Sequence, residues 1–498
     1  MASVSLNSNV SAPARAGRRD ALWLVAACAL VTAVLLAFAE TLAFTGDEGF
    51  HLMAAESIAS GMRPYLDFCF PQTPLEAYWF AALIRCFGPS WRVIHAASAL
   101  TAAAGVALMV DFVYRRFPER PWRLGAALAA AAFIGLSSVM VEFGTVGQAY
   151  GLLVLTTVAA FRLAIAAVDR RGSLPAAAAG LLAGAGAAAS LLSAPVGPVL
   201  LLWIFLQNRA GGRWRKAGGF VGGYALPFLP VLWLFAQSPW VVWFNLTGYH
   251  LYFRTLYWNH PLPHDIDVLT SWAADPLALF IGLLAIGAVF FLGNRSGWEH
   301  TRRSEFYLCG WLAAALSLEL VFGHPTFTRY FVVVAPFAGA LAVPGLYAVG
   351  SRVFAPDRPF WPVLVSVAIA VSVFGRTIPE RHDVLTWPQN EDIARKLLQV
   401  TPPGQQAFTD GVTYFLMRRQ PLPGMEFDYS HKISLPAARL AALHILPEAK
   451  LKQMVLDGRF ASALSCDEED KTYGFDKVFT QKAEVHDCLV YWAPRAVK

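Results

Sequence analysis

Long apolar runs alternate with short polar segments along the first three quarters of the chain. A helix needs about 20 apolar residues to cross the hydrocarbon core of a bilayer. Runs near that length predict eleven membrane-spanning helices, at 21–43, 92–113, 122–141, 147–168, 174–192, 195–207, 217–236, 273–293, 305–322, 328–350 and 359–376. The pattern therefore predicts an α-helical polytopic membrane domain over 1–379.

The pattern changes after residue 380, where charges return and no run is long enough to span a membrane. The segment 390–399 predicts a helix that ends before the Pro-Pro-Gly of 402–404. Strand-like stretches lie at 406–417 and 487–492. We expect a small α/β domain over 380–498.

The composition supports membrane insertion and argues against nucleic-acid binding. The 498 residues are 56% hydrophobic and only 15% charged, whereas soluble domains carry roughly 25% charged residues. The net charge of +6 comes from Lys and Arg in short loops between apolar runs. Because such residues favour the cytoplasmic side, the loops around Arg116, Arg171 and Arg213 predict a cytoplasmic N-terminus. The loop 44–91 and the C-terminal domain then lie on the opposite, extracytoplasmic side.

The first outer loop concentrates acids in a chain that is otherwise poor in charge. Two compatible interpretations of Asp47 follow, and the spacing alone favours the first. Asp47 stands where the N-cap of a predicted helix over 48–59 should stand, and an acid there suits the helix dipole. Alternatively, a carboxylate held at the membrane boundary can act as a general base on a hydroxyl. The acids and the histidine of this loop are Asp47, Glu48, His51, Glu56, Asp67 and Glu76.

Other polar residues collect on the same predicted side of the membrane. Glu142 lies in a turn between two runs, and Arg254 lies in the aromatic outer loop 237–272. That loop is typical of an interfacial aromatic belt, although it could also floor a lipid cavity. His324 and Arg329 precede the run at 328–350. Arg329 could extend toward the interface or hold a phosphate through its two-pronged guanidinium.

The cysteines leave two possibilities open. Cys69 and Cys86 share the first outer loop, and Cys466 and Cys488 share the C-terminal domain. An oxidising compartment permits two disulfides, but four free thiols fit the sequence equally well. Neither a zinc-site spacing nor a nucleotide-binding fingerprint occurs in the sequence.

One set of motifs resembles a known superfamily. The Asp-Glu pair at 47–48 is followed by GMRPYLDF at 61–68 and PQTPLEAYW at 71–79, and Arg329-Tyr330 precede Pro336. This pattern resembles the GT-C membrane glycosyltransferases, in particular family 39 and bacterial lipid A sugar transferases. The resemblance implies a multi-pass protein of the bacterial inner membrane.

The resemblance also implies a chemistry. Asp47 would be the catalytic base, Glu48 the second acid, and the donor a sugar on a polyprenyl phosphate, transferred with inversion to a lipid, glycan or protein hydroxyl. Some relatives carry a Lys that contacts the donor phosphate, but the corresponding run 72–75 has none. Phosphate binding would then fall to an Arg, a His, or a divalent metal at Asp47, Glu48 or His51. Candidate substrate-binding residues are Arg63, Asp67, Glu76, Glu142, Arg254, His324, Arg329 and Tyr330.

Two other functions remain possible on this scaffold. A transporter or flippase for a lipid-linked glycan would also be polytopic, although the sequence shows no internal repeat of the kind that transporters carry. A non-catalytic assembly partner is the other alternative. The Asp-Glu pair favours the enzyme.

Overall fold

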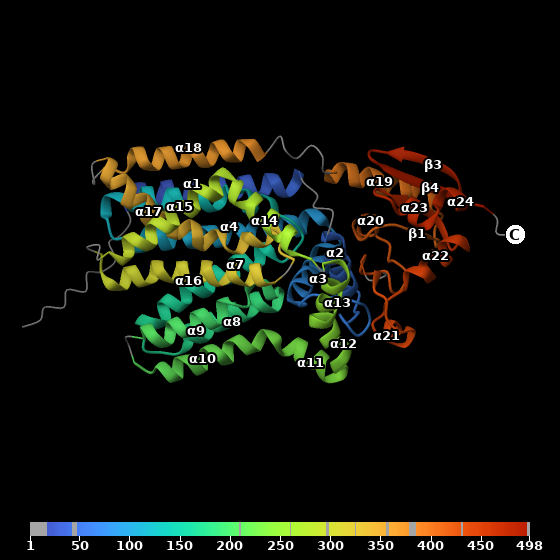
Figure 1. Cartoon of the computed structure of the whole chain (residues 1–498), viewed down its shortest axis with the longest axis horizontal. Helices are drawn as coiled ribbons and strands as arrows, with labels where there is room; N and C mark the ends of the chain where they lie inside the picture. The colour runs from blue at the N-terminus through green and yellow to red at the C-terminus, as the bar shows by residue number, and fades with distance from the viewer. Residues whose placement is uncertain are drawn as a thin grey trace, which may run out of the picture.

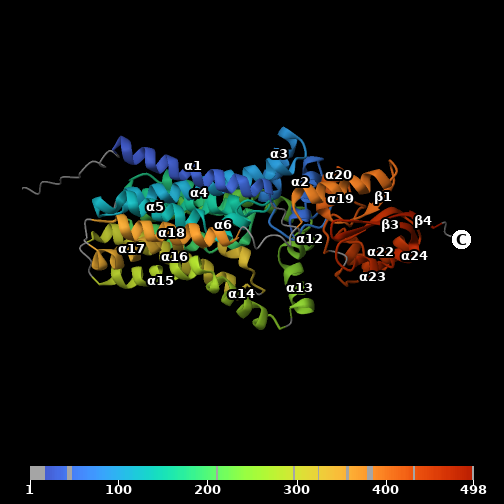
Figure 2. The ribbon, with the colours of Figure 1, turned by 90° about the horizontal axis from the view of Figure 1, so that it is seen from above.

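A long helical bundle carries a smaller α/β body at one end (Figure 1). The computed structural model describes residues 17–41, 47–208, 211–258, 260–294, 298–323, 325–354, 358–377, 385–429 and 432–495. In the view turned by 90°, the same two parts lie end to end, with short helices between them (Figure 2).

The bundle confirms the predicted α-helical polytopic fold, and each predicted run overlaps one or more consecutive helices. Its helices are α1 (Arg18–Thr41), α4 (Trp91–Arg116), α5 (Arg123–Gly135), α7 (Tyr150–Asp169), α8 (Leu174–Ala189), α9 (Val196–Gln207), α10 (Arg213–Ala225), α15 (Pro276–Gly293), α16 (His300–Phe322), α17 (Ala335–Val353) and α18 (Phe360–Thr377). Within the ranges given above, six helical segments are long and apolar enough to cross a membrane unaided. The chain is a multi-pass integral membrane protein.

Small residues bring two bundle helices into backbone contact. A Cβ atom added to Gly180 on α8 would lie 2.0 Å from the carbonyl oxygen of Phe220 on α10. At Gly184, one turn later, it would lie 2.2 Å from the carbonyl oxygen of Tyr224. Any side chain here would force the helices apart, because real Cβ atoms do not approach that closely. The glycine spacing therefore serves close helix packing.

Short helices at the end of the bundle lie in or next to the predicted outer loops. They are α2 (Glu48–Ala59), α3 (Leu75–Phe87), α6 (Ser138–Phe143), α11 (Leu229–Gln237), α12 (Pro239–Trp243), the π-helical turn η4 (Phe244–Gly248), α13 (Tyr249–Tyr257), α14 (Leu262–Ala274) and the 3₁₀ turn η5 (Thr328–Val333). Asn245 on η4 is fully buried. Its side chain accepts from the Phe70 N–H (2.9 Å) and donates to the Val241 carbonyl (2.9 Å). This residue therefore fastens the first outer loop to η4.

The C-terminal region forms a four-stranded sheet in the order β1-β2-β4-β3, with helices packed around it. β1 pairs with β2 in parallel, and the other pairs are antiparallel. The elements are α19 (Trp387–Val400), β1 (Gln406–Phe408), α20 (Gly411–Met417), α21 (Ala437–Ala442), α22 (Glu448–Leu456), β2 (Phe460–Ser465), α23 (Glu469–Tyr473), α24 (Phe475–Val478), β3 (Phe479–Val485) and β4 (Cys488–Pro494).

The structure confirms two of the three elements predicted in this region and corrects the third. The helix at 390–399 lies within α19, and the strand at 487–492 corresponds to β4. The strand-like stretch 406–417 is a strand only to Phe408. Asp410 then caps α20, since its carboxylate accepts from the Thr413 N–H at 2.9 Å, and an Asp N-cap favours a helix over a continued strand.

One of the two possible disulfides forms. Cys466, just after β2, is bonded to Cys488 at the start of β4. Cys69 and Cys86 are free thiols, the first buried and the second exposed. The Cys69 thiol donates instead to the Asn245 side-chain oxygen, at 3.5 Å.

Aromatic stacking joins the C-terminal region to the bundle. The Trp387 ring on α19 stacks on the Trp91 ring on α4, with centroids 4.3 Å apart and planes 8° from parallel. The Trp91 indole also donates to Glu391 at 2.9 Å. Stacked rings combine a large buried area with a defined geometry, so this contact fixes how α19 meets the bundle.

Candidate active site

Asp47 and Arg329 form the centre of the candidate site. An Asp47 carboxylate oxygen (Oδ2) lies 2.7 Å from the Arg329 guanidinium (Nη2), and both side chains are partly exposed. Asp47 does stand immediately before α2, but its own backbone is helical (φ −78°, ψ −10°) and its side chain makes no capping hydrogen bond. The capping interpretation of the carboxylate is therefore wrong. Instead, Asp47 pairs with a cation from a distant part of the chain.

Aromatic rings hold the Arg329 side chain in place. The guanidinium carbon lies 4.3 Å from the Phe327 ring centroid and 5.7 Å from that of Tyr330. Burial alone would lower the pKa of Arg329, but Tyr150 and the Asp47 carboxylate raise it further than burial lowers it. Arg329 therefore stays charged and held by cation–π contacts, which suits a group that must receive an anion.

A second predicted arginine lies in the same region. Arg254 on α13 donates to the Gly323 carbonyl at the end of α16. The pKa of Tyr330 is raised by burial, and the charges of Arg329 and Arg254 both oppose that rise. Arg254 on α13 and Arg329 on η5 are thus two guanidinium groups from separate elements, and Arg329 also contacts the Tyr330 ring. His324, the other predicted residue of this turn, lies outside the described residues.

Glu48 is not exposed to a substrate as the structure stands. Its side chain and that of His95 are fully buried, and the His95 Nε2 atom contacts a Glu48 carboxylate oxygen (Oε1). The other His95 nitrogen, Nδ1, donates to the Ala39 carbonyl at 2.8 Å. The Gly147 N–H donates to the same Glu48 oxygen at 3.1 Å. Glu48 thereby ties the start of α2 to the end of α1, to α4 and to the chain just before α7.

A second buried pair fixes α2 against α3. The His51 Nδ1 atom lies 2.9 Å from a Glu76 carboxylate oxygen. Burial lowers the pKa of His51, but the charge and hydrogen bond of Glu76 outweigh this effect, so the pKa is raised overall. Breaking a buried, hydrogen-bonded pair strongly destabilises the folded state, so this contact holds the two helices together.

These contacts bear directly on the possible metal site at Asp47, Glu48 and His51. The three side chains point to three different partners, namely Arg329, His95 and Glu76. In the part of the chain that the structure covers, no group of three or more His, Cys, Asp and Glu side chains could hold a metal ion.

Arg63, Asp67 and Glu142 are the remaining predicted residues. Arg63 and Asp67 pair with each other at 2.8 Å in an exposed ion pair, and Arg63 also donates to Gln237 at 3.3 Å. Glu142 is half-buried on α6, and α6 packs against η5. Glu142 therefore neighbours the element that carries Arg329, whereas Arg63 and Asp67 order the loop.

The sequence did not point to a contribution from the C-terminal region. Tyr429 follows Phe427, whose ring packs edge-on against Phe50 of α2 (centroids 4.9 Å apart). Burial and the charges of Asp47 and Asp428 raise the pKa of Tyr429, and Arg329 opposes them. Tyr429 is thus within electrostatic reach of both members of the central pair. A single Asp-Tyr in a loop carries no sequence signal that could have revealed this.

The segment before Tyr429 makes stability depend on pH. Burial raises the pKa of Glu426 to about 7, even though the Gly424 N–H, which donates to it at 2.7 Å, has the opposite effect. A carboxyl whose pKa is raised in the folded state stabilises it below the ordinary value near 4.5, and that stability is lost as the pH rises through about 7. One pKa unit corresponds to about 1.4 kcal/mol, so the loss approaches about 3 kcal/mol.

We therefore expect Glu426→Gln, which can still accept from Gly424, to unfold at a higher temperature than the parent protein at pH 8 and at a similar temperature at pH 5. Thermal unfolding in detergent at the two pH values measures this difference. Glu484→Gln on the exposed face of β3 is the matched control and should track the parent. An equal response of the two variants would contradict the assignment of the titration to Glu426.

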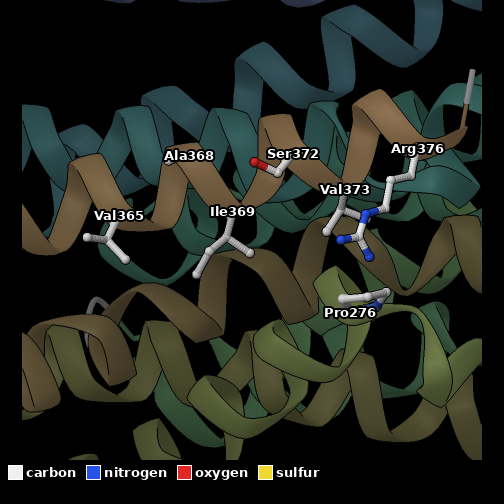
Figure 3. Close-up of a pocket in the computed structure, with 7 residues that line it drawn as sticks. All are labelled: Pro276, Val365, Ala368, Ile369, Ser372, Val373 and Arg376. Carbon is white, nitrogen blue, oxygen red and sulfur yellow. The ribbon is translucent and has the colours of Figure 1, made fainter.

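A surface groove elsewhere holds none of the predicted site residues. It has a volume of about 330 Å³ and lies between α18 and the start of α15. Its walls are Val365, Ala368, Ile369, Ser372 and Val373, with Pro276 opposite, and the Arg376 side chain points across it toward Pro276 (Figure 3). The groove does not contain the Asp47–Arg329 pair and is not part of the candidate site.

Comparison with known proteins gives no match by family model or by sequence to curated proteins, but it gives clear structural matches. The crystal structure of ArnT from Cupriavidus metallidurans bound to undecaprenyl phosphate has a TM-score of 0.62 and 15% sequence identity, over 94% of this chain and 97% of that one. In the apo state its TM-score is 0.63. The oligosaccharyltransferase AglB from Archaeoglobus fulgidus, in complex with an inhibitory peptide and a dolichol-phosphate, has a TM-score of 0.52 and 12% identity, over 96% and 75% of the two chains.

Proposed function

We propose that this multi-pass membrane protein, whose fold is that of the GT-C glycosyltransferases, transfers a sugar from a polyprenyl-phosphate donor to an acceptor hydroxyl. The observation that carries the proposal is the Asp47–Arg329 pair, 2.7 Å apart at the end of the bundle. It puts a potential proton acceptor next to a potential phosphate ligand. The structural relatives support a polyprenyl-phosphate donor, since one is bound to undecaprenyl phosphate and another to a dolichol-phosphate.

In the proposed reaction Asp47 accepts the proton of the acceptor hydroxyl as its oxygen attacks the anomeric carbon. The bond between that carbon and the phosphate oxygen breaks, and the polyprenyl phosphate leaves with the electron pair. Attack from the face opposite the leaving group inverts the anomeric centre. A phosphate needs no general acid to leave, so one carboxylate suffices where a glycosidase uses two.

Arg329 links the two halves of this reaction. In the resting protein Arg329 pairs with Asp47, but a donor phosphate would compete for the same guanidinium, because Arg binds phosphate through paired hydrogen bonds. Donor binding would then draw Arg329 away and leave the Asp47 carboxylate available to the acceptor. Arg254 would supply a second positive charge for the leaving phosphate. We assign Glu48 a positioning role, because its contacts with His95 and Gly147 fix the residue next to Asp47.

Sugar transfer in proteoliposomes tests the proposal. Lipid extracts of a deletion strain, compared with the parent strain by mass spectrometry, identify the sugar that is lost. Purified protein is then supplied with that sugar on undecaprenyl phosphate and with lipid extract from the deletion strain as acceptor. The proposal expects a sugar-modified product and free undecaprenyl phosphate in equal amounts. Movement of intact donor across the bilayer without any transfer would favour a flippase instead.

The proposed orientation places the reaction on the extracytoplasmic face of the bacterial inner membrane, with the N-terminus in the cytoplasm. We expect single cysteines at Arg171 and Arg213 to be protected from an impermeant thiol reagent in intact cells, and one at Asp457 in the C-terminal domain to react. The background should be Cys86→Ser, because Cys86 is an exposed free thiol. Labelling at position 213 in intact cells, with position 457 protected, would reverse the orientation.

A further inference from the structure

The C-terminal domain meets α2 immediately beside Asp47. A Cβ atom on Gly49 would lie 2.8 Å from the backbone nitrogen of Val412, and one on Gly411 would lie 2.8 Å from the carbonyl carbon of Gly49. The first turns of α2 and α20 are therefore in backbone contact, which only glycine permits on both sides. Both views place α20 next to α2 (Figures 1 and 2). The contact begins two residues after Asp47.

The segment 427–429 lies against this junction. An Asp428 carboxylate oxygen accepts from the Gly411 N–H at 3.3 Å, so this carboxylate sits at the point where the two helices meet. Phe427 packs edge-on against both Phe50 of α2 and Tyr249 of α13, with centroids 4.9 and 5.3 Å apart. These rings are buried and hold the segment firmly, whereas Asp428 and Tyr429 keep part of their surface exposed.

The charges of the segment and of the central pair influence each other. Burial raises the pKa of Asp428 to about 7, with further contributions from the charges of Asp410 and Asp47, while the Gly411 N–H lowers it. The charge of Asp47 raises the pKa of the Tyr429 hydroxyl, and the charge of Arg329 lowers it. The carboxylates and the Tyr429 hydroxyl come from the first loop and from the C-terminal domain, and the backbone contact between Gly49 and Gly411 brings these two parts of the chain together beside Asp47.

From this arrangement we propose that Asp428 and Tyr429 bind the acceptor, and that the acceptor is a sugar or another polyol with neighbouring hydroxyls. The inference rests on the proposed function. One hydroxyl gives its proton to Asp47 and attacks the donor, whose polyprenyl phosphate leaves as described above. A neighbouring hydroxyl donates a hydrogen bond to Asp428, which exchanges no proton, and Tyr429 donates to a ring or hydroxyl oxygen.

A single hydroxyl, such as that of a serine or threonine side chain, fits this site less well. It would engage Asp47 and leave the half-buried Asp428 carboxylate with only its bond from the Gly411 N–H. Leaving a buried polar group unpaired carries a desolvation cost, and sites built to hydrogen-bond a substrate hydroxyl strongly reject analogues that lack it. The arrangement therefore favours a glycan or glycolipid acceptor over a protein side chain.

The test separates acceptor binding from donor binding in the full-length protein. We expect Asp428→Asn and Tyr429→Phe each to raise the amount of deletion-strain lipid extract needed for half-maximal transfer by about tenfold or more. Both variants should bind undecaprenyl phosphate, measured alone by tryptophan fluorescence, as the parent does. Asp457→Asn and Tyr473→Phe in the same domain are the controls and should change neither quantity.

Several outcomes would overturn the inference. One is that Tyr429→Phe and Asp428→Asn both need the same amount of lipid extract for half-maximal transfer as the parent does. Another is that these variants lose undecaprenyl-phosphate binding to the same extent as acceptor use, which would indicate a general structural role. Transfer by the parent protein to a serine- or threonine-containing peptide in preference to the lipid extract would also overturn it. The proposed function fails separately, if Asp47→Asn and Glu142→Gln both transfer sugar at the parental rate.

Discussion

Asp47→Asn should give a folded protein that binds undecaprenyl phosphate and transfers sugar at least about a hundredfold more slowly than the parent. A positioned general base contributes roughly 10²–10⁴-fold in rate, and Asn cannot take a proton from the acceptor. The substitution keeps the shape of the side chain, and its amide oxygen can still accept from Arg329. Because Asp47 makes no capping hydrogen bond, a large loss cannot come from a lost helix cap. Initial rates in proteoliposomes measure the effect.

Asp67→Asn is the matched control, since it changes an acid of the same loop. Asp67 pairs with Arg63 on the surface, and such pairs are worth about 1 kcal/mol or less, so activity should stay near the parental rate. Glu142→Gln tests the other acid near Arg329. If Asp47→Asn keeps most of its activity while Glu142→Gln loses it, Glu142 is the base, and if neither loses activity the transferase proposal fails.

The sequence predicted the membrane helices well because their signal is local. Each span buries its apolar surface in lipid or against other helices, so length and composition alone identify it. The sequence left open whether Cys466–Cys488 and Cys69–Cys86 are disulfides or four free thiols, and in the structure only the first pair is bonded.

The sequence placed Asp47 and Arg329 on one side of the membrane but could not predict that they touch. Their contact depends on how η5 packs against the end of the bundle, which no local pattern records. His95 shows the limit most clearly. It lies inside the predicted run 92–113, where a lone histidine is easily passed over, yet it holds Glu48 in a buried pair. An ionisable residue within an apolar run is the one signal that could have found it.

The contribution of the C-terminal domain was missed for a related reason. The segment 426–429 has no regular secondary structure, and its importance comes from the backbone contact between Gly49 and Gly411. No sequence pattern indicates that two glycines so far apart in the chain are in contact. The strand-like pattern at 406–417 also concealed α20, the helix that makes the contact, because its apolar residues fit either period and the capping by Asp410 decides between them.

Arg329→Lys should weaken use of the donor while leaving the protein folded. Lysine keeps the positive charge but loses the planar, two-pronged guanidinium that matches a phosphate, and it forgoes much of the contact with the Phe327 ring. A hydrogen bond to a charged group is worth about 1.5–3 kcal/mol, which corresponds to a rise of about tenfold to a hundredfold in the donor KM. The acceptor requirement should change far less.

Arg254→Lys separates the two arginines. Arg254 is anchored by the Gly323 carbonyl, and a lysine ammonium can still donate to that oxygen, so we expect a smaller rise in donor KM than at position 329. If donor binding draws Arg329 away from Asp47, excess undecaprenyl phosphate should speed the modification of the Asp47 carboxylate by a carboxyl-modifying reagent in the parent protein. It should change this rate far less in Arg329→Lys, in which the carboxylate is already freer. Parental donor kinetics in both Arg329→Ala and Arg254→Ala would move the phosphate site elsewhere and remove Arg329 from the mechanism.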